Sequence, residues 1–299
     1  MRSKPIILHF AEYLAAKACL RTLEWLPRSQ AERLAHAVLR ALARLIPRFE
    51  QVGHRNLALA LPTLDELQRR RILEGMWVSL GRVLASLAKF PQLDRENIHD
   101  WIEYEGYEHY REAKAAGRGV IFVTGHLGNW ELSAFAHALM SEPLNVVVRP
   151  LDNPFLDRLL EQRRQLSGNR IIPKSGAAAP ILAALRRNEA VGILVDQNTS
   201  ADEGVFVKFF GVLACSTPAP ARLAARTGAA VIPGFALWVE EKQRYVLRFY
   251  PPIALSGDPL ADTQAIQSQI ERVIREYPDQ WLWIHRRWKT RPPGEKFLY

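Results

Sequence analysis

Residues 120–131 of this 299-residue chain hold the side chains best suited to catalysis. His126 lies in a turn-forming stretch with Gly125 and Gly128, and Glu131 follows after four intervening residues. A carboxylate that accepts a hydrogen bond from one imidazole nitrogen fixes the tautomer, so the other nitrogen can take a proton from a hydroxyl. The spacing therefore predicts a His126–Glu131 general base. In the non-catalytic alternative, His126 caps a strand end and Glu131 is a solvated acid favoured by a helix dipole.

The residues around this pair predict how it is presented. Residues 120–123 are β-branched or aromatic and form a buried strand, and ligands of open α/β sheets bind at the carboxyl ends of such strands. Asn129 is a suitable N-cap for a helix that begins at Trp130. A turn before that helix is required, because on one continuous helix the two side chains would point roughly 140° apart.

Further polar side chains follow other predicted strands. Arg149 comes after residues 145–148, and arginine at a sheet edge suits phosphate or carboxylate recognition. Residues 196–198, Asp-Gln-Asn, follow a buried strand and could orient a sugar, a hydroxyl or a metal. Residues 207–211 set Lys208 beside two phenylalanines, a suitable wall for a lipid chain. Taken singly, each has a structural alternative: a surface ion pair, an Asx-turn and core aromatics.

Strands and helices alternate after residue 117. Strands are predicted at 120–124, 145–148, 190–195, 231–239 and 245–250, and helices at 153–166, 178–188 and 218–227. Such alternation predicts an α/β fold with a mostly parallel central sheet flanked by helices. Residues 101–299 are therefore expected to form the catalytic core, with residues 1–100 as a helical region packed on it.

The helical region has the character of a membrane-associating segment. Residues 6–26 and 29–45 form basic amphipathic helices, and a third helix is predicted at 64–89. Charged residues interrupt every long apolar window of the first segment, so neither a spanning helix nor a signal peptide is expected. Basic amphipathic helices with aromatic residues suit a membrane interface, which favours monotopic contact. The alternative, that these helices pack only on the protein's own core, stays open.

Composition limits the class of protein and partner. The hydrophobic content of 48% supports a sizeable globular core. Cys19 and Cys215 have no metal-binding or disulfide-like spacing, which fits a reducing compartment. The net charge of +9 indicates an anionic partner, and nucleic acid, anionic membrane and acidic carrier protein all qualify.

Several motifs together closely resemble the lipid A late acyltransferase family, within the wider glycerolipid acyltransferase group. Their order and spacing match across nearly the whole chain, at residues 125–131, 149–154, 196–197, 209–211 and 281–288. The resemblance implies an enzyme at the cytoplasmic face of a Gram-negative inner membrane. It would move an acyl chain from acyl carrier protein onto a hydroxyl of a lipid A precursor, with the thioester as co-substrate, no cofactor, no metal and no nucleic-acid partner.

The resemblance also implies roles for individual residues. His126, held by Glu131, would activate the acceptor hydroxyl without a covalent enzyme intermediate. The chemistry also requires donors for an oxyanion, and backbone N–H groups around Gly128 and Asn129, at a predicted helix start, are candidates for that role. The matching positions suggest that Arg149 binds an acceptor phosphate or sugar acid.

Lys208 or Arg287 would assist Arg149 in that contact. Asp196 and Gln197 would position the acceptor. The charged N-terminal segment departs from the clearer hydrophobic anchor that is frequent in the family, which leaves the mode of membrane attachment open between a tilted helix and monotopic contact.

Three other readings remain. An acyltransferase of the same fold could use another glycolipid or an amino-acid lipid, with acyl-CoA or acyl carrier protein as donor. A metal-dependent hydrolase would use His126, Glu131 and Asp196 as ligands. A basic binding protein would explain the charge but not the polar strand ends, and residues 69–71, its only triple arginine run, suit a solvated helix face.

Overall fold

A seven-stranded sheet forms the centre of the computed structural model, which describes residues 5–299. Its strands are β1 (Ile102–Glu105), β2 (Val120–Thr124), β3 (Asn145–Val148), β4 (Arg170–Pro173), β5 (Ala190–Leu194), β8 (Ala230–Val239) and β9 (Arg244–Phe249). Their spatial order is β1-β9-β8-β2-β5-β3-β4, and only the β8–β9 pair is antiparallel. The predicted α/β fold with a mostly parallel sheet is confirmed.

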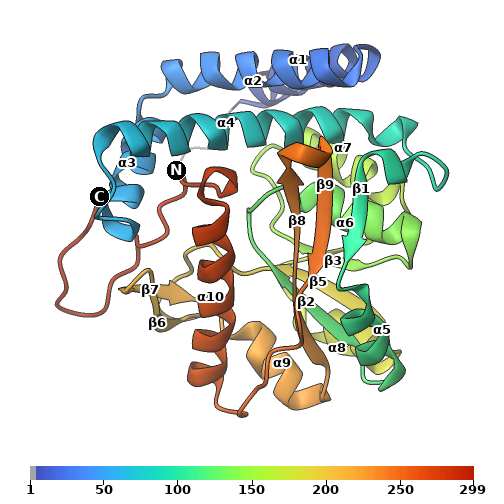
Figure 1. Cartoon of the computed structure of the whole chain (residues 1–299), viewed down its shortest axis with the longest axis vertical. Helices are drawn as coiled ribbons and strands as arrows, with labels where there is room; N and C mark the ends of the chain where they lie inside the picture. Colours follow the sequence, from blue (N-terminus) through green and yellow to red (C-terminus); the bar gives the residue numbers. More distant parts are fainter. Residues whose placement is uncertain (1–4) are drawn as a thin grey trace.

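Helices cover the sheet, as Figure 1 shows. They are α1 (Ile6–Trp25), α2 (Arg28–Leu45), α3 (Arg48–Ala60), α4 (Glu66–Lys89), α5 (Tyr107–Ala115), α6 (Trp130–Met140), α7 (Pro154–Gln165), α8 (Ala178–Arg186), α9 (Ala219–Thr227) and α10 (Pro259–Glu276). The predicted helices and strands are confirmed to within a few residues. The sequence patterns missed α3, α5 and α10, the short strands β1 and β4, and a separate hairpin formed by β6 (Val205–Phe209) and β7 (Val212–Ser216).

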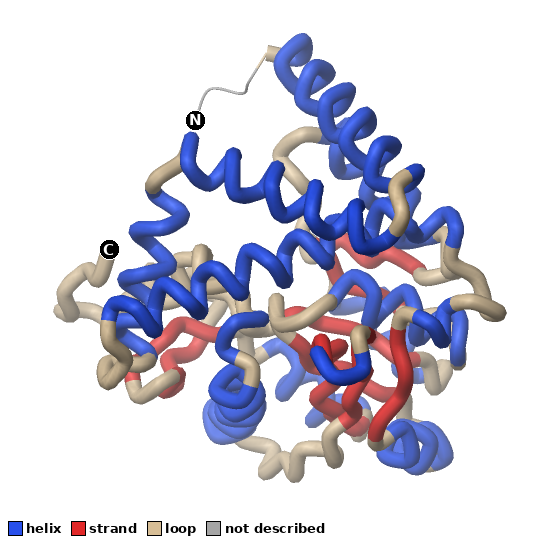
Figure 2. The backbone as a smooth tube through the Cα atoms, turned by 45° about the horizontal axis from the view of Figure 1, so that its top comes forward, coloured by secondary structure: helices blue, strands red, loops and turns tan. Residues whose placement is uncertain are grey.

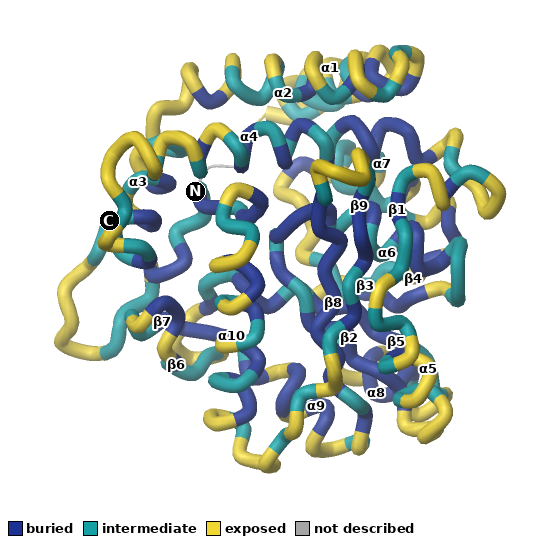
Figure 3. Tube along the Cα trace, viewed as in Figure 1, coloured by how far each residue is buried: buried dark blue, intermediate teal, exposed yellow. Residues whose placement is uncertain are grey.

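Strand β2 is buried on both faces over residues 120–123, which is why these four residues are apolar. Ile121 and Val123 belong to one hydrophobic cluster, whereas Val120 and Phe122 belong to another on the opposite face. The alternation follows from the two-residue period of a strand. Burial along the central strands is visible in Figure 3.

The N-terminal helices lie beyond one end of the sheet. Helix α4 crosses that end and separates it from α1 and α2 (Figures 1 and 2). Leu23 of α1 and Ala35 of α2 are fully buried in a small cluster with the C-terminal part of α4. Helix α1 thus packs partly on the protein's own core, as one of the two alternatives predicted.

The first half of α1 presents apolar side chains to solvent. Ile7 is 80% exposed, and Phe10 and Leu14 are each about half exposed. Within residues 5–299, no helix is both long and apolar enough to cross a membrane. Contact of this apolar surface with a membrane interface stays a prediction.

The C-terminal tryptophan motif belongs to the core. Trp281, Trp283 and Trp288 are at most 1% exposed, and Phe209 packs edge-on against Trp281 at 5.7 Å. The expectation that residues 207–211 form a wall for a lipid chain is therefore wrong. Phe209 and Phe210 are buried because their hairpin closes over α10 and these tryptophans.

Candidate active site

Strand register brings His126 and Asp196 together. Strands β2 and β5 are parallel neighbours in which Thr124 pairs with Leu194, and each polar residue lies two positions beyond its strand. The ladder continues past the strands, since the N–H of Val195 donates to the carbonyl of Thr124 at 3.0 Å. The carboxyl ends of two parallel strands lie side by side in register, so residues 126 and 196, just beyond those ends, are neighbours.

Asp196 holds His126 through both carboxylate oxygens. Its Oδ1 lies 2.9 Å from Nδ1 of the imidazole, and its Oδ2 accepts from the backbone N–H of His126 at 2.8 Å. The indole Nε1 of Trp281 also donates to Oδ2, at 2.8 Å. Gly125 allows this approach, because a Cβ there would lie 3.1 Å from the Asp196 side chain.

The electrostatics of Asp196 favour its charged form. Burial disfavours the carboxylate, but the charge of His126 and the hydrogen bonds from His126 and Trp281 outweigh it and lower the pKa of Asp196 to about 2. A carboxylate partner at Nδ1 favours the tautomer that carries its proton there. The other nitrogen, Nε2, then bears the lone pair of a base.

The free nitrogen of His126 points at the polar end of β5. Its Nε2 lies 3.3 Å from Nε2 of Gln197, which is consistent with donation from the amide to the imidazole. The Trp130 ring lies beside the imidazole, with centroids 5.0 Å apart. Asp196 and Gln197 thus both contact His126, and their predicted role in positioning the acceptor stays a prediction.

Glu131 has a different partner from the one expected. Its two oxygens accept from Arg164 of α7 at 2.9 and 2.6 Å, in a bidentate ion pair. The expected hydrogen bond between His126 and Glu131 is replaced, because Asp196 occupies Nδ1 and Arg164 occupies the Glu131 carboxylate. Both His126 and Glu131 nevertheless line one cavity.

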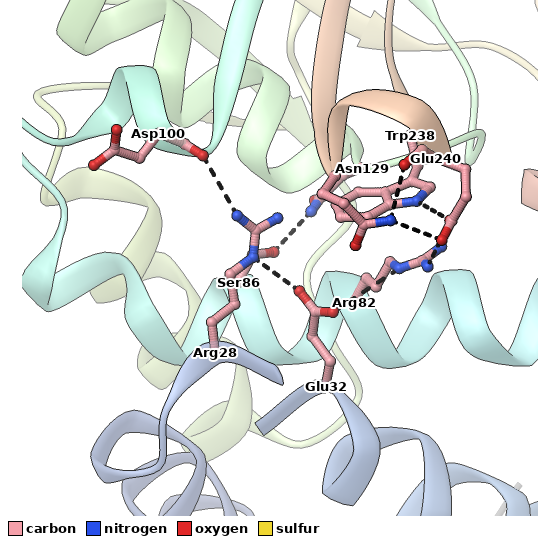
Figure 4. A network of polar contacts seen from close by, with 9 residues as sticks. Arg28, Glu32, Arg82, Ser86, Asp100, Asn129, Trp238 and Glu240 are labelled. Carbon is pink, nitrogen blue, oxygen red and sulfur yellow. Dashed lines mark hydrogen bonds and ion pairs between the residues drawn. The ribbon is translucent and has the colours of Figure 1, made fainter. Parts of the chain in front are cut away.

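Asn129 has a structural position. It is fully buried, its Oδ1 caps α6 by accepting from the N–H of Leu132, and its Nδ2 donates to Ser86 of α4 at 2.7 Å (Figure 4). The same close-up shows Arg28, Glu32 and Arg82 at this junction of α2, α4 and the β8 end. The predicted N-cap is confirmed, and the Asn129 side chain is not among the cavity walls.

The predicted oxyanion donors are also engaged elsewhere. The N–H of Gly128 donates to the carbonyl of Gln280 at 3.0 Å, and that of Asn129 donates to Ala236 at 2.8 Å. The predicted oxyanion hole around these residues therefore cannot use the N–H groups of Gly128 and Asn129 themselves in this arrangement. Both are used to fasten the turn to neighbouring segments.

A cavity of about 1140 Å³ opens at His126. Its apolar lining residues include Phe90, Phe135 and Val146. Polar walls come from the predicted residues Arg149 and Gln197. The cavity thus joins an imidazole base to both apolar and polar surfaces.

The three cationic side chains that were predicted to bind substrate lie in different environments. Arg149 lines the cavity, and its side chain is 79% exposed and pairs with Asp152 at 3.4 Å. Lys208 is exposed on β6 and is not among the cavity walls. Arg287 is fully buried, where it donates to the carbonyl of Cys215 at 2.8 Å and to Ser216.

Direct substrate contact by Lys208 or Arg287 is therefore wrong for this structure. Lys208 is exposed on the hairpin and does not line the cavity, and the aromatic core encloses Arg287. Burial lowers the pKa of Arg287 to about 10, with partial compensation by the Asp196 charge.

Several site residues were missed by the sequence patterns. Arg164 lies on an ordinary helix face, and the sequence carries no signal for its ion pair. Trp281 and His285 belong to the terminal motif, yet nothing local connects them with residue 126. His285 lines the cavity, its Nε2 accepts from the N–H of Asn198 at 3.1 Å, and burial lowers its pKa to about 4.

Over residues 5–299, no three or more His, Cys, Asp or Glu side chains converge in a group that could hold a metal ion. The hydrolase alternative named His126, Glu131 and Asp196 as metal ligands. His126 and Asp196 contact each other, whereas Glu131 forms an ion pair with Arg164.

Comparison with known proteins gives a consistent result. The bacterial lipid A biosynthesis acyltransferase family matches residues 2–290. A lipid A biosynthesis lauroyltransferase of Escherichia coli is 30% identical over 272 residues, 89% of this chain and 88% of the relative. A palmitoleoyltransferase of the same organism is 29% identical, with 87% and 85% covered.

One relative acts on a different lipid by name. A phosphatidylinositol mannoside acyltransferase of Mycolicibacterium smegmatis is 28% identical over 271 residues, 88% of each chain. The family match spans almost the entire chain and includes every residue of the site described above. The protein is thus an acyltransferase that belongs to the bacterial lipid A biosynthesis acyltransferase family.

Proposed function

We propose that the protein transfers a fatty acyl chain from an acyl carrier protein thioester to a hydroxyl of a lipid A precursor, with His126 as general base. The observation that carries this proposal is the two-oxygen contact between Asp196 and His126, at 2.9 and 2.8 Å. It supports a base whose Nε2 is aimed at a cavity rather than at a protein nucleophile. Direct attack by the acceptor then needs no covalent enzyme intermediate.

The reaction runs in two steps. Nε2 of His126 takes the proton of the acceptor hydroxyl as its oxygen bonds to the thioester carbonyl carbon. The resulting tetrahedral intermediate collapses with cleavage of the C–S bond, and the imidazolium returns its proton to the departing thiolate. Asp196 stabilises the imidazolium between the steps, so it is a positioning residue rather than a proton carrier.

The developing oxyanion needs donors near His126. The first-turn N–H groups of Trp130 and Glu131 have no partner among the described residues, and both residues line the cavity. The amide of Gln197 is a third donor, since an acceptor oxygen at Nε2 would release it from the imidazole. Such preorganised donors stabilise charge where it forms.

Glu131 acts through Arg164 in this proposal. The bidentate pair ties the first turn of α6 to α7 on the cavity wall. It fixes the direction of the Trp130 and Glu131 N–H groups, a positioning role.

Residues 1–100 form the membrane-associating region, at the cytoplasmic face of the inner membrane. The exposed apolar half of α1 supports contact with a bilayer interface, and the +9 charge supports binding to anionic lipid and to acidic carrier protein. No cofactor enters the reaction, since the thioester itself supplies the activated acyl group.

An alternative acceptor is another glycolipid. The mannoside acyltransferase relative favours this second candidate, because its name describes a different acceptor at comparable identity. The base and its partners would serve either acceptor equally.

The test is acyl transfer from carrier protein to a lipid A precursor in detergent with EDTA. We compare the native enzyme with His126→Ala, Asp196→Asn and Glu131→Gln, after thermal denaturation shows that each variant is folded. Loss of a general base or its orienting carboxylate lowers kcat by roughly 10²- to 10⁴-fold. We expect that loss for His126→Ala and Asp196→Asn, and a smaller loss for Glu131→Gln.

Two results would contradict the mechanism. Near-native kcat for Asp196→Asn with a collapse for Glu131→Gln would make Glu131 the partner of the base. Activity of the native enzyme that disappears only with EDTA would favour metal chemistry. Transfer to a phosphatidylinositol mannoside, but not to the lipid A precursor, would select the second acceptor.

A further inference from the structure

The side chains that line the cavity carry an excess of positive charge. Five cations and four carboxylates line the whole cavity: Arg149, Arg164, Lys174, Arg222 and Arg226, with Glu131, Asp152, Asp202 and Glu203. Three ion pairs neutralise most of them, at 3.4 Å for Arg149–Asp152, 2.6 Å for Arg164–Glu131 and 3.6 Å for Lys174–Glu203. The charges that remain are two arginines and Asp202.

Arg222 and Arg226 stand on one face of α9. They are four residues apart, which sets neighbouring side chains on the same helix surface. Both are exposed, and no ion pair joins either side chain to any residue in the described part of the chain. Asp202 is engaged locally, because a hydrogen bond from Ser200 and one from its own backbone lower its pKa.

The helix start beside these arginines adds to the positive potential. Thr217, Pro218 and Ala219, at the N-terminal end of α9, also line the cavity. The first turn of α9 contains no acidic residue. The helix dipole and the two guanidinium groups therefore act in the same direction on an anion in the cavity.

We propose that Arg222 and Arg226 form a phosphate-binding subsite that holds a phosphate ester of the substrate while its hydroxyl or thioester lies at His126. This inference rests on the proposed function. Guanidinium groups suit tetrahedral phosphate oxygens, and an unpaired pair inside a cavity has no other charge to satisfy it. Arg222 and Arg226 would thus have the phosphate-binding role that was predicted for Lys208 or Arg287, neither of which lines the cavity.

Two parts of the reaction can supply such an ester. A phosphorylated sugar lipid carries it on the acceptor, and a phosphopantetheine arm carries it on the donor. Kinetics with each phosphate removed in turn distinguishes the sources.

The experiment compares the native enzyme with Arg222→Gln/Arg226→Gln. The matched control is Arg111→Gln/Arg186→Gln, which removes the same charge from exposed arginines that do not line the cavity. Acceptors with and without phosphate are used, and acyl-phosphopantetheine is compared with acyl-pantetheine. Loss of charge-assisted contacts should raise KM for the phosphorylated substrate roughly 10- to 100-fold, with kcat changed far less.

Each result decides the question. A rise in KM only for the phosphorylated acceptor, or only for the phosphorylated donor, supports the subsite and identifies its source. Equal KM values for the double variant and the control overturn it.

A binding measurement separates this inference from the proposed function. If the native enzyme transfers no acyl chain to any acceptor, calorimetric titrations with a bisphosphorylated disaccharide and with phosphopantetheine still apply. Binding of either ligand that is lost only in Arg222→Gln/Arg226→Gln supports the subsite even then, and unchanged binding of both ligands overturns it.

Discussion

Asp196 remains ionised although it is buried, because the imidazole of His126 and the Trp281 indole surround it. Its pKa of about 2 lies below the ordinary value of 3.8. The ionised carboxylate therefore contributes to the free energy of unfolding at pH above 3.8, and this contribution is lost as pH falls towards 2. The contact with His126 is therefore intact over the range in which acyl transfer is measured. The hydrogen bonds between Asp196 and His126 thus both orient the imidazole and stabilise the folded state.

His137 is a second histidine whose environment has a measurable consequence. It is 2% exposed, Tyr104 contacts its Nδ1 at 3.2 Å, and its Nε2 has no partner among the described residues. Burial, partly offset by Glu142, lowers its pKa from 6.5 to about 4. The folded state therefore binds fewer protons than the unfolded state between these values.

His137 should consequently lower the free energy of unfolding by about 3 kcal/mol as pH decreases from 6.5 to 4. We predict that His137→Phe flattens this pH dependence, because the ring fits the aromatic surroundings and cannot take up a proton. Urea unfolding at several pH values measures it, with exposed His99→Phe as control. An unchanged slope in His137→Phe would show that His137 is already solvated.

At the scale of elements, the turn between β2 and α6 depends on Gly128. Its φ is +63°, and a Cβ would lie 2.0 Å from the carbonyl oxygen of Ala236. The same turn is tied to the C-terminal segment, since the N–H of Leu282 donates to the carbonyl of His126 at 3.0 Å. The position of the imidazole therefore depends on contacts from two distant segments.

We predict that Gly128→Ala destabilises the protein by about 2 kcal/mol or more and lowers kcat, because both strain and collision displace the turn. Gly192→Ala in β5 is the matched control, as a Cβ there meets nothing within 4 Å. Urea denaturation and acyl transfer measure the two effects. Equal stability of the two variants would contradict the argument.

At the scale of the whole molecule, apolar exposure is uneven. The exposed side chains Ile7 and Leu14 lie on α1, whereas α10 begins on the far side of the molecule, with Leu260 in its first turn (Figure 1). The basic charge of the chain would strengthen contact of the α1 side with an anionic surface. Such contact would set one face of the molecule against the lipid.

We predict that Ile7→Glu/Leu14→Glu weakens binding to vesicles of anionic phospholipid roughly tenfold or more, since each substitution removes an apolar side chain that would enter the bilayer interface and adds repulsion. Leu260→Glu, where the leucine is as exposed as Leu14 at 49%, should bind as the native protein does. Sedimentation with vesicles at low and high salt measures this. Equal loss in both variants would indicate a general charge effect.

The sequence by itself determined the local features. Apolar runs predicted the strands, helical periodicity predicted α1, α2 and α4, and glycine flanking identified the turn that carries His126. These signals are local because backbone preferences and burial patterns act over a few neighbouring residues. Asn129 as an N-cap follows from the same kind of information.

Only the tertiary structure decided which distant groups meet. The β2–β5 register gave His126 the partner Asp196, helix packing gave Glu131 the partner Arg164, and the aromatic core enclosed Arg287. Glu131 was the nearer carboxylate in sequence, but a parallel strand pair aligns residues 70 positions apart more closely than a turn aligns neighbours. Charge and hydrogen-bonding capacity are properties of a residue, whereas its partner is a property of the packing.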